Sequence, residues 1–300
     1  MVLNNLNVIH AIRTKGAINS AKRIAYMLNR YGLGSQKMKA NILKYTAILK
    51  KYNIKGTFFI TVESAILHKD FLANLKGIEL AVHGYKHINY VTLHKDVKEN
   101  HLQKINDIFK NPNFLTNGFR APYLSQDNIM LDLLSNNGFL FDSSASKLWS
   151  VPSEIINKNK KAYDLALELY DPKDFELPYL TESGLLEIPV SLPDDEILID
   201  RLGIKDSETI GKIWLDILDK THKNKSLFVL QLHPERINIA ANALCSILVA
   251  AKKKSPPIWI TNLGELAKWW VSKPKNKRWP SNYQSALCIT GDIDRMSLLK

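Results

Sequence analysis

The chain has 300 residues, enough for one large barrel or two smaller domains, and at this length roughly 75% of the unfolded surface can be buried. Its composition, 45% hydrophobic and 23% charged, is typical of a soluble globular protein. No apolar run approaches the ~18 residues of a membrane-spanning helix, so we expect no span. The net charge of +12 permits an acidic polymer, a nucleic acid or an anionic membrane surface as a partner.

Most of this positive charge is scattered along the chain. The basic clusters lack the interleaved aromatic residues of a single-strand binding groove, so we expect no stable nucleic-acid complex. Peripheral association with an anionic membrane or polymer stays open. The N-terminus lacks the basic segment, apolar core and cleavage site of a secretory signal, which predicts a cytoplasmic protein. Cys245 and Cys288 form no metal or redox motif, and we expect reduced thiols.

Helix-like and strand-like segments alternate from residue 36 onward, the pattern of a parallel sheet with crossover helices. Residues 1–35 are expected to form a helical extension that packs on the outside, with a helix over 17–28. The predicted strands lie at 56–62, 78–82, 118–121, 139–142, 185–190, 227–232, 258–261 and 286–290. The predicted helices lie at 37–52, 92–109, 126–136, 208–221, 237–253 and 263–271.

Seven or eight parallel strands favour a closed barrel, with an open doubly wound sheet as the alternative. Without an internal repeat or a flexible linker, a single domain over residues 36–300 is preferred. Residues 149–183 show the least regular pattern. We expect them to form an insertion or a lid-like excursion, because long irregular stretches are uncommon in compact domains without a role.

Two histidines follow the second predicted strand. His83 and His87 are three residues apart, which lets two imidazoles bind one metal on a helix or across a tight turn, and Gly84 favours the turn. Two structural or surface histidines are the alternative.

The last predicted strand ends in Thr290-Gly-Asp-Ile-Asp294. In an extended segment, Asp292 and Asp294 would face the same side, where two like charges need a cation or a shared proton. A polar strand end that caps a turn is the alternative. With the histidine pair, Asp294 would complete a His₂Asp set with open positions, as a catalytic zinc requires.

Arg120 and His233 are also placed at strand ends. Pro122 keeps Ala121 extended after Arg120, and an arginine there can orient a carboxylate, although a structural salt bridge explains it equally. His233 lies where parallel barrels assemble their sites, at the carboxyl ends of the strands, and could alternatively be a turn histidine.

In combination, these motifs resemble the polysaccharide deacetylase family, metal-dependent deacetylases with a distorted (β/α)7 barrel. Four counterparts follow the family's order: Thr57-Phe-Phe, His83-x₃-His87, Arg120-Ala-Pro-Tyr123 and Leu232-His233. The aspartate pair comes last instead of first, so the chain resembles a circularly permuted member. The resemblance therefore implies a single-domain, distorted (β/α)7–8 barrel with its aspartate-bearing strand at the C-terminal end.

The resemblance also implies a role for each matched residue. His83, His87 and Asp294 would bind a divalent metal, with Zn²⁺ preferred, and Asp292 would be the general base, held by Arg120. The backbone N–H of Tyr123 would help to receive the oxyanion, and His233 would protonate the leaving group. The substrate would be an N- or O-acetylated sugar or polysaccharide.

Three departures from the family pattern affect these roles. Gly84 stands where many members have Ser or Thr, and Gln231 stands where a leucine often lines the acetyl pocket. The acidic partner of His233 is open between Asp194 and Asp195. A hydrolase of small amides or cyclic amides, and a non-catalytic carbohydrate- or nucleic-acid-binding barrel, are the alternative functions. The oligomeric state is left open.

Overall fold

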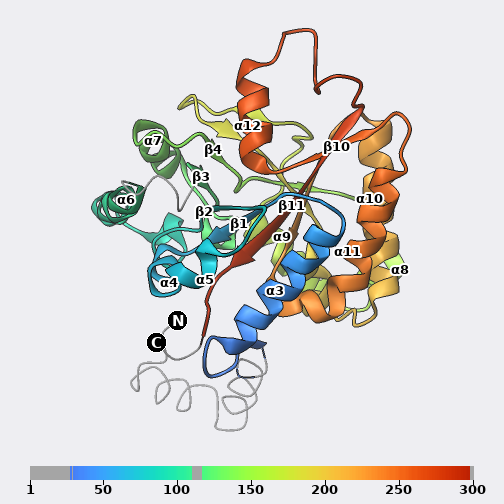
Figure 1. Ribbon diagram of the computed structural model, residues 1–300, viewed down its shortest axis with the longest axis horizontal. Coiled ribbons are helices and arrows are strands. Elements are labelled where there is room, and N and C mark those ends of the chain that lie inside the picture. Colours follow the sequence, from blue (N-terminus) through green and yellow to red (C-terminus); the bar gives the residue numbers. More distant parts are fainter. Residues whose placement is uncertain (1–27, 29, 110–116, 298–300) are drawn as a thin grey trace.

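A curled, largely parallel sheet forms the centre of the molecule, and helices pack around it (Figure 1). The structure is a computed structural model that describes residue 28, residues 30–109 and residues 117–297. The predicted N-terminal extension over 1–35 falls almost entirely outside these residues. Its packing on the barrel therefore stays a prediction.

The aspartate-bearing strand lies inside the sheet. Strand β11 (Ser285–Ile293) pairs on one side with β9 (Leu227–Leu232) and on the other with β1 (Gly56–Ile60), all in parallel. The first residues of β11 also pair with β10 (Ile258–Thr261), whose register places it end to end with β1. Strand β2 (Ile78–Val82) continues the sheet beyond β1.

The sheet returns to β9 through two pairs of short consecutive strands. From β2 it runs through β3 (Gly118–Phe119) to β4 (Phe141–Asp142) and β7 (Leu186–Glu187). After β4 and β7, the chain continues directly into β5 (Ser146–Leu148) and β8 (Val190–Leu192), which pair with each other. Strand β8 then meets β9 at Ser191 and Leu230, so the predicted distorted α/β barrel is confirmed. Strand β6 (Tyr179–Leu180) adds an antiparallel edge to β7.

The long helices follow the predicted segments closely. Several begin at a side chain that accepts a hydrogen bond from the first turn: Asp127 before α7, Asp206 before α10 and Asn262 before α12. The bounds are α3 Gln36–Lys51, α6 Lys95–Phe109, α7 Asn128–Asn136, α10 Ser207–Lys223, α11 Ile237–Lys252 and α12 Leu263–Ser272. The short helices are α4 Val62–Leu67, α5 Lys69–Ala73 and α8 Ser153–Ile156, with one-turn helices η1 Tyr90–Thr92, η2 Pro122–Leu124 and η4 Pro234–Arg236.

The segment expected to be irregular, 149–183, contains regular structure. It holds α8, the helix α9 (Lys160–Tyr170) and β6, and the wide helix η3 (Glu196–Arg201) follows β8. In α9, the apolar residues Tyr163 and Ala166 pack inward and lie three positions apart. This helical spacing gives only a weak signal in the sequence.

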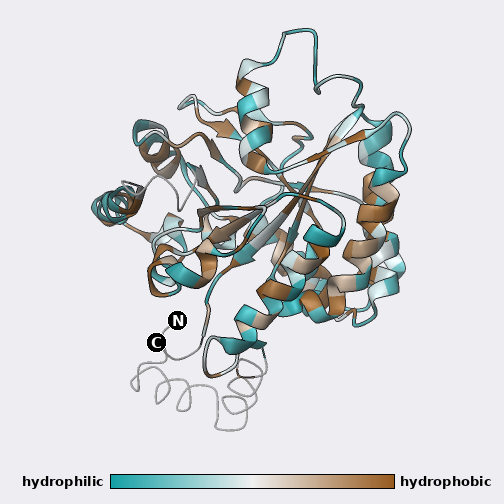
Figure 2. Ribbon diagram, in the orientation of Figure 1, coloured by the Kyte–Doolittle hydropathy of each residue, from teal (hydrophilic) through white to brown (hydrophobic). Residues whose placement is uncertain are grey.

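Apolar side chains fill both faces of the sheet, as the alternation along its strands requires. Along β1, Phe58 and Ile60 join the large cluster beneath the helices, whereas Phe59 joins a second cluster on the other face with Phe141 and Cys288. Strands β1, β9 and β11 are accordingly buried along their whole length, and their apolar stretches appear brown in Figure 2.

Two predictions about the chain as a whole can be compared with the described residues. Both cysteines are free thiols, with Cys288 buried and Cys245 partly buried. Among the described helices, none has the length and hydropathy needed to cross a bilayer.

Candidate active site and metal centre

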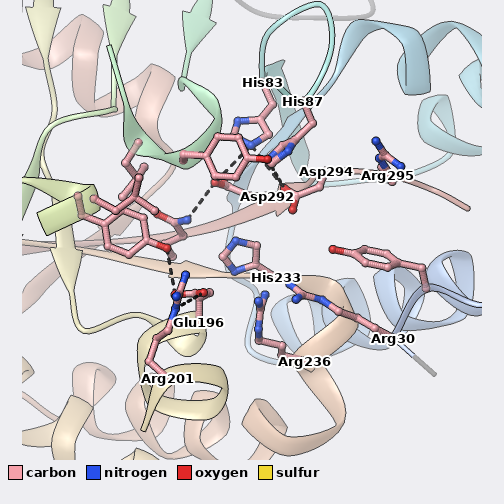
Figure 3. A pocket seen from close by; sticks show the side chains of 16 residues that line it. Arg30, His83, His87, Glu196, Arg201, His233, Arg236, Asp292, Asp294 and Arg295 are labelled. Atoms are coloured by element: carbon pink, nitrogen blue, oxygen red, sulfur yellow. Dashed lines mark hydrogen bonds and ion pairs between the residues drawn. The ribbon is translucent and has the colours of Figure 1, made fainter. Parts of the chain in front are cut away.

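A cavity of about 430 Å³ opens where the sheet strands end (Figure 3). The carboxyl ends of parallel strands meet at one edge, which is where such folds assemble their sites. Of the predicted site residues, His83, His87, Tyr123, His233, Asp292 and Asp294 line this cavity. Arg120 lies beneath it and is completely buried.

Three predicted metal ligands converge at one side of the cavity. Asp294 Oδ1 lies 3.5 Å from His83 Nε2 and 3.3 Å from His87 Nε2. Two ligand atoms bound at ~2.1 Å to one tetrahedral ion lie about 3.4 Å apart, so these separations suit a single ion. All three ligand atoms lie within 4.8 Å of one another. The donor set therefore fits a divalent metal with open coordination positions.

Hydrogen bonding fixes which nitrogen of His83 can bind a metal. His83 Nδ1 lies 2.9 Å from the backbone carbonyl of Arg120, which can only accept, so Nδ1 carries a proton and Nε2 is the nitrogen that faces the metal site. Burial lowers the pKa of His87 to about 4, and the neighbouring Asp294 only partly offsets this, so His87 is neutral at pH 7. His87 is thus in the form that binds metal.

The turn between the two histidines requires glycine. Gly84 has φ +74°, and a Cβ there would lie 2.7 Å from a ring carbon of Tyr90. The Tyr90 hydroxyl accepts a hydrogen bond from the backbone N–H of Tyr85, within the same turn. The ring of Tyr90 therefore occupies the space that a Ser or Thr side chain would need.

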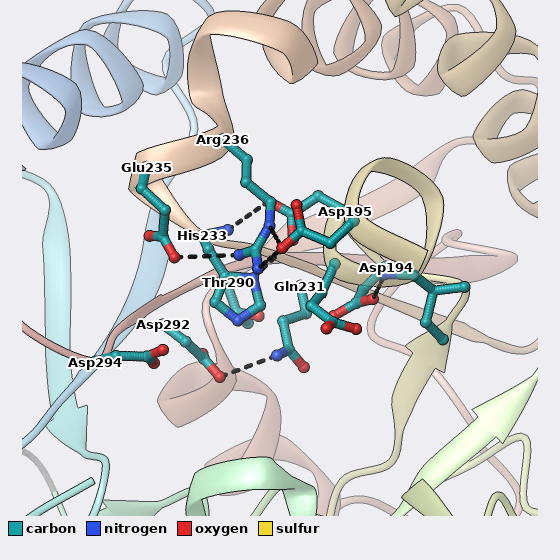
Figure 4. Close-up of polar contacts among 12 residues, drawn as sticks. Asp194, Asp195, Gln231, His233, Glu235, Arg236, Thr290, Asp292 and Asp294 are labelled. Carbon is teal, nitrogen blue, oxygen red and sulfur yellow. Dashed lines mark hydrogen bonds and ion pairs between the residues drawn. The ribbon is translucent and has the colours of Figure 1, made fainter. Parts of the chain in front are cut away.

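The carboxylate of Asp292 is held by hydrogen bonds from two sides, and Figure 4 shows the one from Gln231. Arg120 Nη1 donates to Oδ1 at 2.8 Å, and Gln231 Nε2 donates to Oδ2 at 3.0 Å. Arg120 is itself fixed, because its other nitrogens donate to Ser143 and Nη1 also reaches Thr290 Oγ1 at 2.9 Å. This network keeps Asp292 oriented and next to the metal ligands, with Oδ2 4.0 Å from His83 Nε2.

Asp195 is the acidic partner of His233. Its Oδ1 lies 2.6 Å from His233 Nδ1, and its Oδ2 accepts from the His233 backbone N–H at 2.6 Å. Asp194, the other candidate, accepts from the backbone N–H of Ile197 instead. Burial alone would lower the pKa of His233, but the Asp195 carboxylate outweighs it and raises that pKa to about 10. His233 is therefore protonated at neutral pH, with Nε2 available to the cavity.

Residues 122–124 carry the loop with the predicted oxyanion donor. Tyr123 and Leu124 have φ of 63° and 53°, a left-handed conformation that is uncommon outside glycine. The ring of Tyr123 packs edge to face on His87, with 4.6 Å between the ring centroids. This contact holds the loop against the proposed metal ligands. A strained backbone conformation persists only when surrounding contacts hold it in this way.

The sequence was compared with known protein families. Residues 31–141 match the sequence profile of the family described as polysaccharide deacetylase. The match places a polysaccharide deacetylase domain within residues 31–141 of the chain. Members of this family remove acetyl groups from acetylated sugars, so the predicted family and enzyme class, a hydrolase of the deacetylase type, are confirmed.

Similar proteins cover most of the chain. A peptidoglycan deacetylase-like protein from Gibberella zeae is 24% identical over 268 residues, or 80% of this chain and 78% of its own. Two solved structures, provisionally described as polysaccharide deacetylases, share the fold. The Mycobacterium smegmatis structure has a TM-score of 0.59 and 21% identity over 91% of this chain and 87% of its own. For the Pseudomonas aeruginosa structure the values are 0.64, 19%, 82% and 76%.

Some residues of the candidate site had only a weak sequence signal. Gln231 was noted as a departure from the family pattern, but its bond to Asp292 was not foreseen. The signal was its position two residues before His233, which places both side chains on one face of β9. Thr290 had the same relation to Asp292. Ser143 gave no signal, because it reaches Arg120 from a neighbouring strand.

A second pair of carboxyl groups lies behind the deacetylase site. Asp142 and Glu187 face each other in register on β4 and β7 and are fully buried. Ser144 Oγ donates to Asp142 Oδ1, and the backbone N–H groups of Ser144 and Ala145 donate to Glu187 Oε1. The remaining oxygens, Oδ2 and Oε2, have no other partner, and burial raises the pKa of both groups. We infer that the pair shares one proton.

Replacing Glu187 by glutamine should stabilise the protein at alkaline pH. The raised pKa values mean that the folded state binds more protons than the unfolded state, so stability falls as pH rises above the usual carboxyl range. A glutamine keeps the acceptor for Ser144 and Ala145 and supplies a permanent donor to Asp142. We expect a free energy of unfolding at pH 8 that is higher by roughly 1 kcal/mol or more. Urea unfolding at pH 5 and pH 8 measures this, and a less stable variant at pH 8 contradicts the shared proton.

Replacing Asp195 by asparagine should shift the alkaline limb of activity to lower pH. A general acid must carry its proton, and His233 keeps it up to about pH 10 because of Asp195. Without that charge, the limb should move down by about 1–3 pH units. Because the pKa is raised in the folded state, the stability gained from this pair is present below pH 6.5 and lost as pH rises through 10. Profiles of kcat/KM against pH test this, and an unshifted limb contradicts the role of Asp195.

Proposed function

We propose that the protein is a divalent-metal-dependent deacetylase of acetylated sugars, with an Asp base and a His acid. The observation that carries this proposal is the convergence of His83, His87 and Asp294 between two oriented groups. Asp292, with Arg120 behind it, lies on one side, and His233, with Asp195 behind it, lies on the other. A binding module has no need for an oriented base and a protonated acid on opposite sides of one cavity.

The chain's own residues supply both proton transfers. Asp292 accepts a proton from the attacking water, and Arg120 and Gln231 hold its carboxylate in position for this step. The water oxygen adds to the acetyl carbonyl carbon while the backbone N–H of Tyr123 donates to the developing oxyanion. His233 then protonates the sugar nitrogen as the C–N bond breaks, releasing acetate and a free amine.

A divalent ion held by His83, His87 and Asp294 would supply a Lewis acid for the carbonyl and for the attacking water. Two imidazoles and one carboxylate are the ligand types of catalytic zinc sites, so Zn²⁺ is the preferred ion. An N-acetylated or O-acetylated sugar polymer is the substrate class.

The strand order supports a circular permutation of the family's barrel. β11 follows every other strand of the sheet in the chain, yet it occupies the place beside β1. In the family order, the strand before Thr-Phe-Phe carries the aspartate pair. Joining Lys300 to Met1 and opening the chain before Ser281 would restore that order. We expect this rearranged chain to fold and to keep its activity, and a chain that folds without activity would count against the proposal.

Acetate release is the direct test of the proposed function. The purified protein should release acetate from N-acetylglucosamine oligomers or from O-acetylated polysaccharides. Treatment with a chelator should remove this activity, and added Zn²⁺ should restore it. Acetate release that persists after complete metal removal would contradict the proposal, as would a metal-loaded protein without activity on any acetylated sugar.

A further inference from the structure

Four arginines line the cavity. Arg30, Arg201, Arg236 and Arg295 belong to its lining, whereas the acidic lining residues are Glu196, Asp292 and Asp294. The two aspartates belong to the proposed base and metal ligands. Apart from that centre, the cavity wall therefore carries four positive groups and one negative group.

Two of these arginines are held from behind by two acids, the buried carboxylate of Glu235 and the partly buried carboxylate of Asp200. Glu235 Oε1 accepts from Arg30 Nη2 at 2.6 Å and from Arg236 Nη1 at 3.2 Å. Asp200 Oδ2 accepts from Arg30 Nη1 at 3.2 Å and from Arg236 Nη2 at 2.6 Å. Neither Glu235 nor Asp200 lines the cavity. The four charges are balanced, but the arginines face the cavity and the acids lie behind them, so the guanidinium groups are fixed before any ligand arrives.

Arg201 adds a positive group from η3. Its Nε donates to Glu196 Oε1 at 2.8 Å, and the Tyr170 hydroxyl donates to Glu196 Oε2 at 3.0 Å. Both oxygens of Glu196 are thereby engaged. Among the described residues, the Arg201 side chain donates a hydrogen bond only through Nε. Its two Nη groups can therefore donate to a ligand. Its side chain is 33% exposed, so a ligand in the cavity can reach it.

Three of the four arginines lie across the cavity from the metal ligands, whereas Arg295 lies beside Asp294. Figure 3 shows Arg30, Arg201 and Arg236 grouped around His233, with His83, His87 and Asp294 across the cavity. His233 protonates the group that leaves, so its surroundings contact the sugar, whereas the metal ligands contact the acetyl group. An anion held by these arginines would thus be a substituent of the sugar.

We propose that the sugar released by this enzyme carries an anionic substituent, a carboxylate or a phosphate, close to the acetylated position. This inference rests on the proposed deacetylase function and names its substrate class. Arginine suits this role because its planar guanidinium group can donate two parallel hydrogen bonds to the oxygens of a carboxylate or a phosphate. Arg201 has the free donors for direct contact, and Arg30 and Arg236 supply a fixed positive field around it.

Matched substrates test the proposal. An N-acetylated glycan with carboxylates is compared with the same glycan after its carboxylates are reduced to alcohols, and a phosphorylated N-acetylated glycan forms the third arm. We expect kcat/KM to be about 10- to 100-fold higher for an anionic form, mainly through a lower KM, with a preference that weakens at high salt. The arm with the larger gain identifies the anion. Equal activity on all three overturns the proposal and leaves the deacetylase function standing, whereas no acetate from any of them overturns that function instead.

The variant Arg201→Gln tests the contact itself. We expect the ratio of kcat/KM for the anionic and reduced glycans to fall at least about tenfold, because the free guanidinium donors are lost. Lys161→Gln, which removes an exposed positive charge on α9, is the charge-matched control and should leave the ratio unchanged. A ratio that falls equally in both variants would show general electrostatic attraction and would overturn a specific site.

Discussion

Replacing Asp294 by alanine should remove both the metal and the deacetylase activity. Asp294 Oδ1 is the only carboxylate oxygen of the three-ligand group, and two neutral histidines cannot by themselves hold a divalent ion tightly. The loss of a Lewis acid worth several kcal/mol should reduce kcat/KM by at least about 10³-fold. Elemental analysis of the purified variant and an acetate-release assay measure the two effects. His83→Ala should behave in the same way.

His94→Ala is the matched control for the histidine variant, because His94 is exposed and does not line the cavity. It should retain metal and activity. An Asp294→Ala protein that keeps full activity would remove the proposed metal centre from the mechanism, whatever its metal content.

Replacing Asp292 by asparagine should abolish activity while the metal stays bound. The asparagine keeps the size of the side chain and an oxygen for Arg120, but it cannot accept a proton from water. Loss of a general base typically costs about 10²- to 10⁴-fold in rate. Because Asp292 Oδ2 is 4.0 Å from His83 Nε2, it lies outside the three-ligand group, and metal content should stay near that of the unchanged protein.

The contrast between the two aspartate variants separates the two roles. Thermal unfolding of Asp292→Asn should also be followed, since Arg120 loses its charged partner in a fully buried position. If Asp292→Asn lost the metal and Asp294→Ala kept it, Asp292 would be the metal ligand and Asp294 the base, the reverse of the proposed roles.

The residues of the candidate site could be located from the sequence because each lies at or just after the end of a strand. Parallel strands that end at one edge bring His83, Arg120 and His233 together without knowledge of the loops between them. The two-residue period of a strand placed Asp292 and Asp294 on one side. These inferences needed only local patterns and one rule of sheet architecture.

The remaining contacts depend on how neighbouring strands are aligned. Asp195 rather than Asp194 meets His233, and this choice depends on the single pairing between β8 and β9 at Ser191 and Leu230. A shift of one residue would exchange the two aspartates. The bond from Gln231 to Asp292 likewise requires that Gln231 face Thr290 in the register of β9 and β11. Sequence periodicity carries no information on such alignments.

The place of β11 between β9 and β1 has a consequence for synthesis of the chain. Every other described strand of the sheet precedes β11 in the chain. During translation, the place between β9 and β1 therefore stays empty until β11 has been synthesised. Until then, β1 and β9 are exposed edges made of apolar, β-branched and aromatic residues, which are prone to pair with other chains. The segment that closes this gap also delivers Asp292 and Asp294. The nascent chain therefore gains its protected edges and its proposed catalytic carboxylates in the same event, and we expect a chain interrupted before β11 to be both inactive and prone to aggregate.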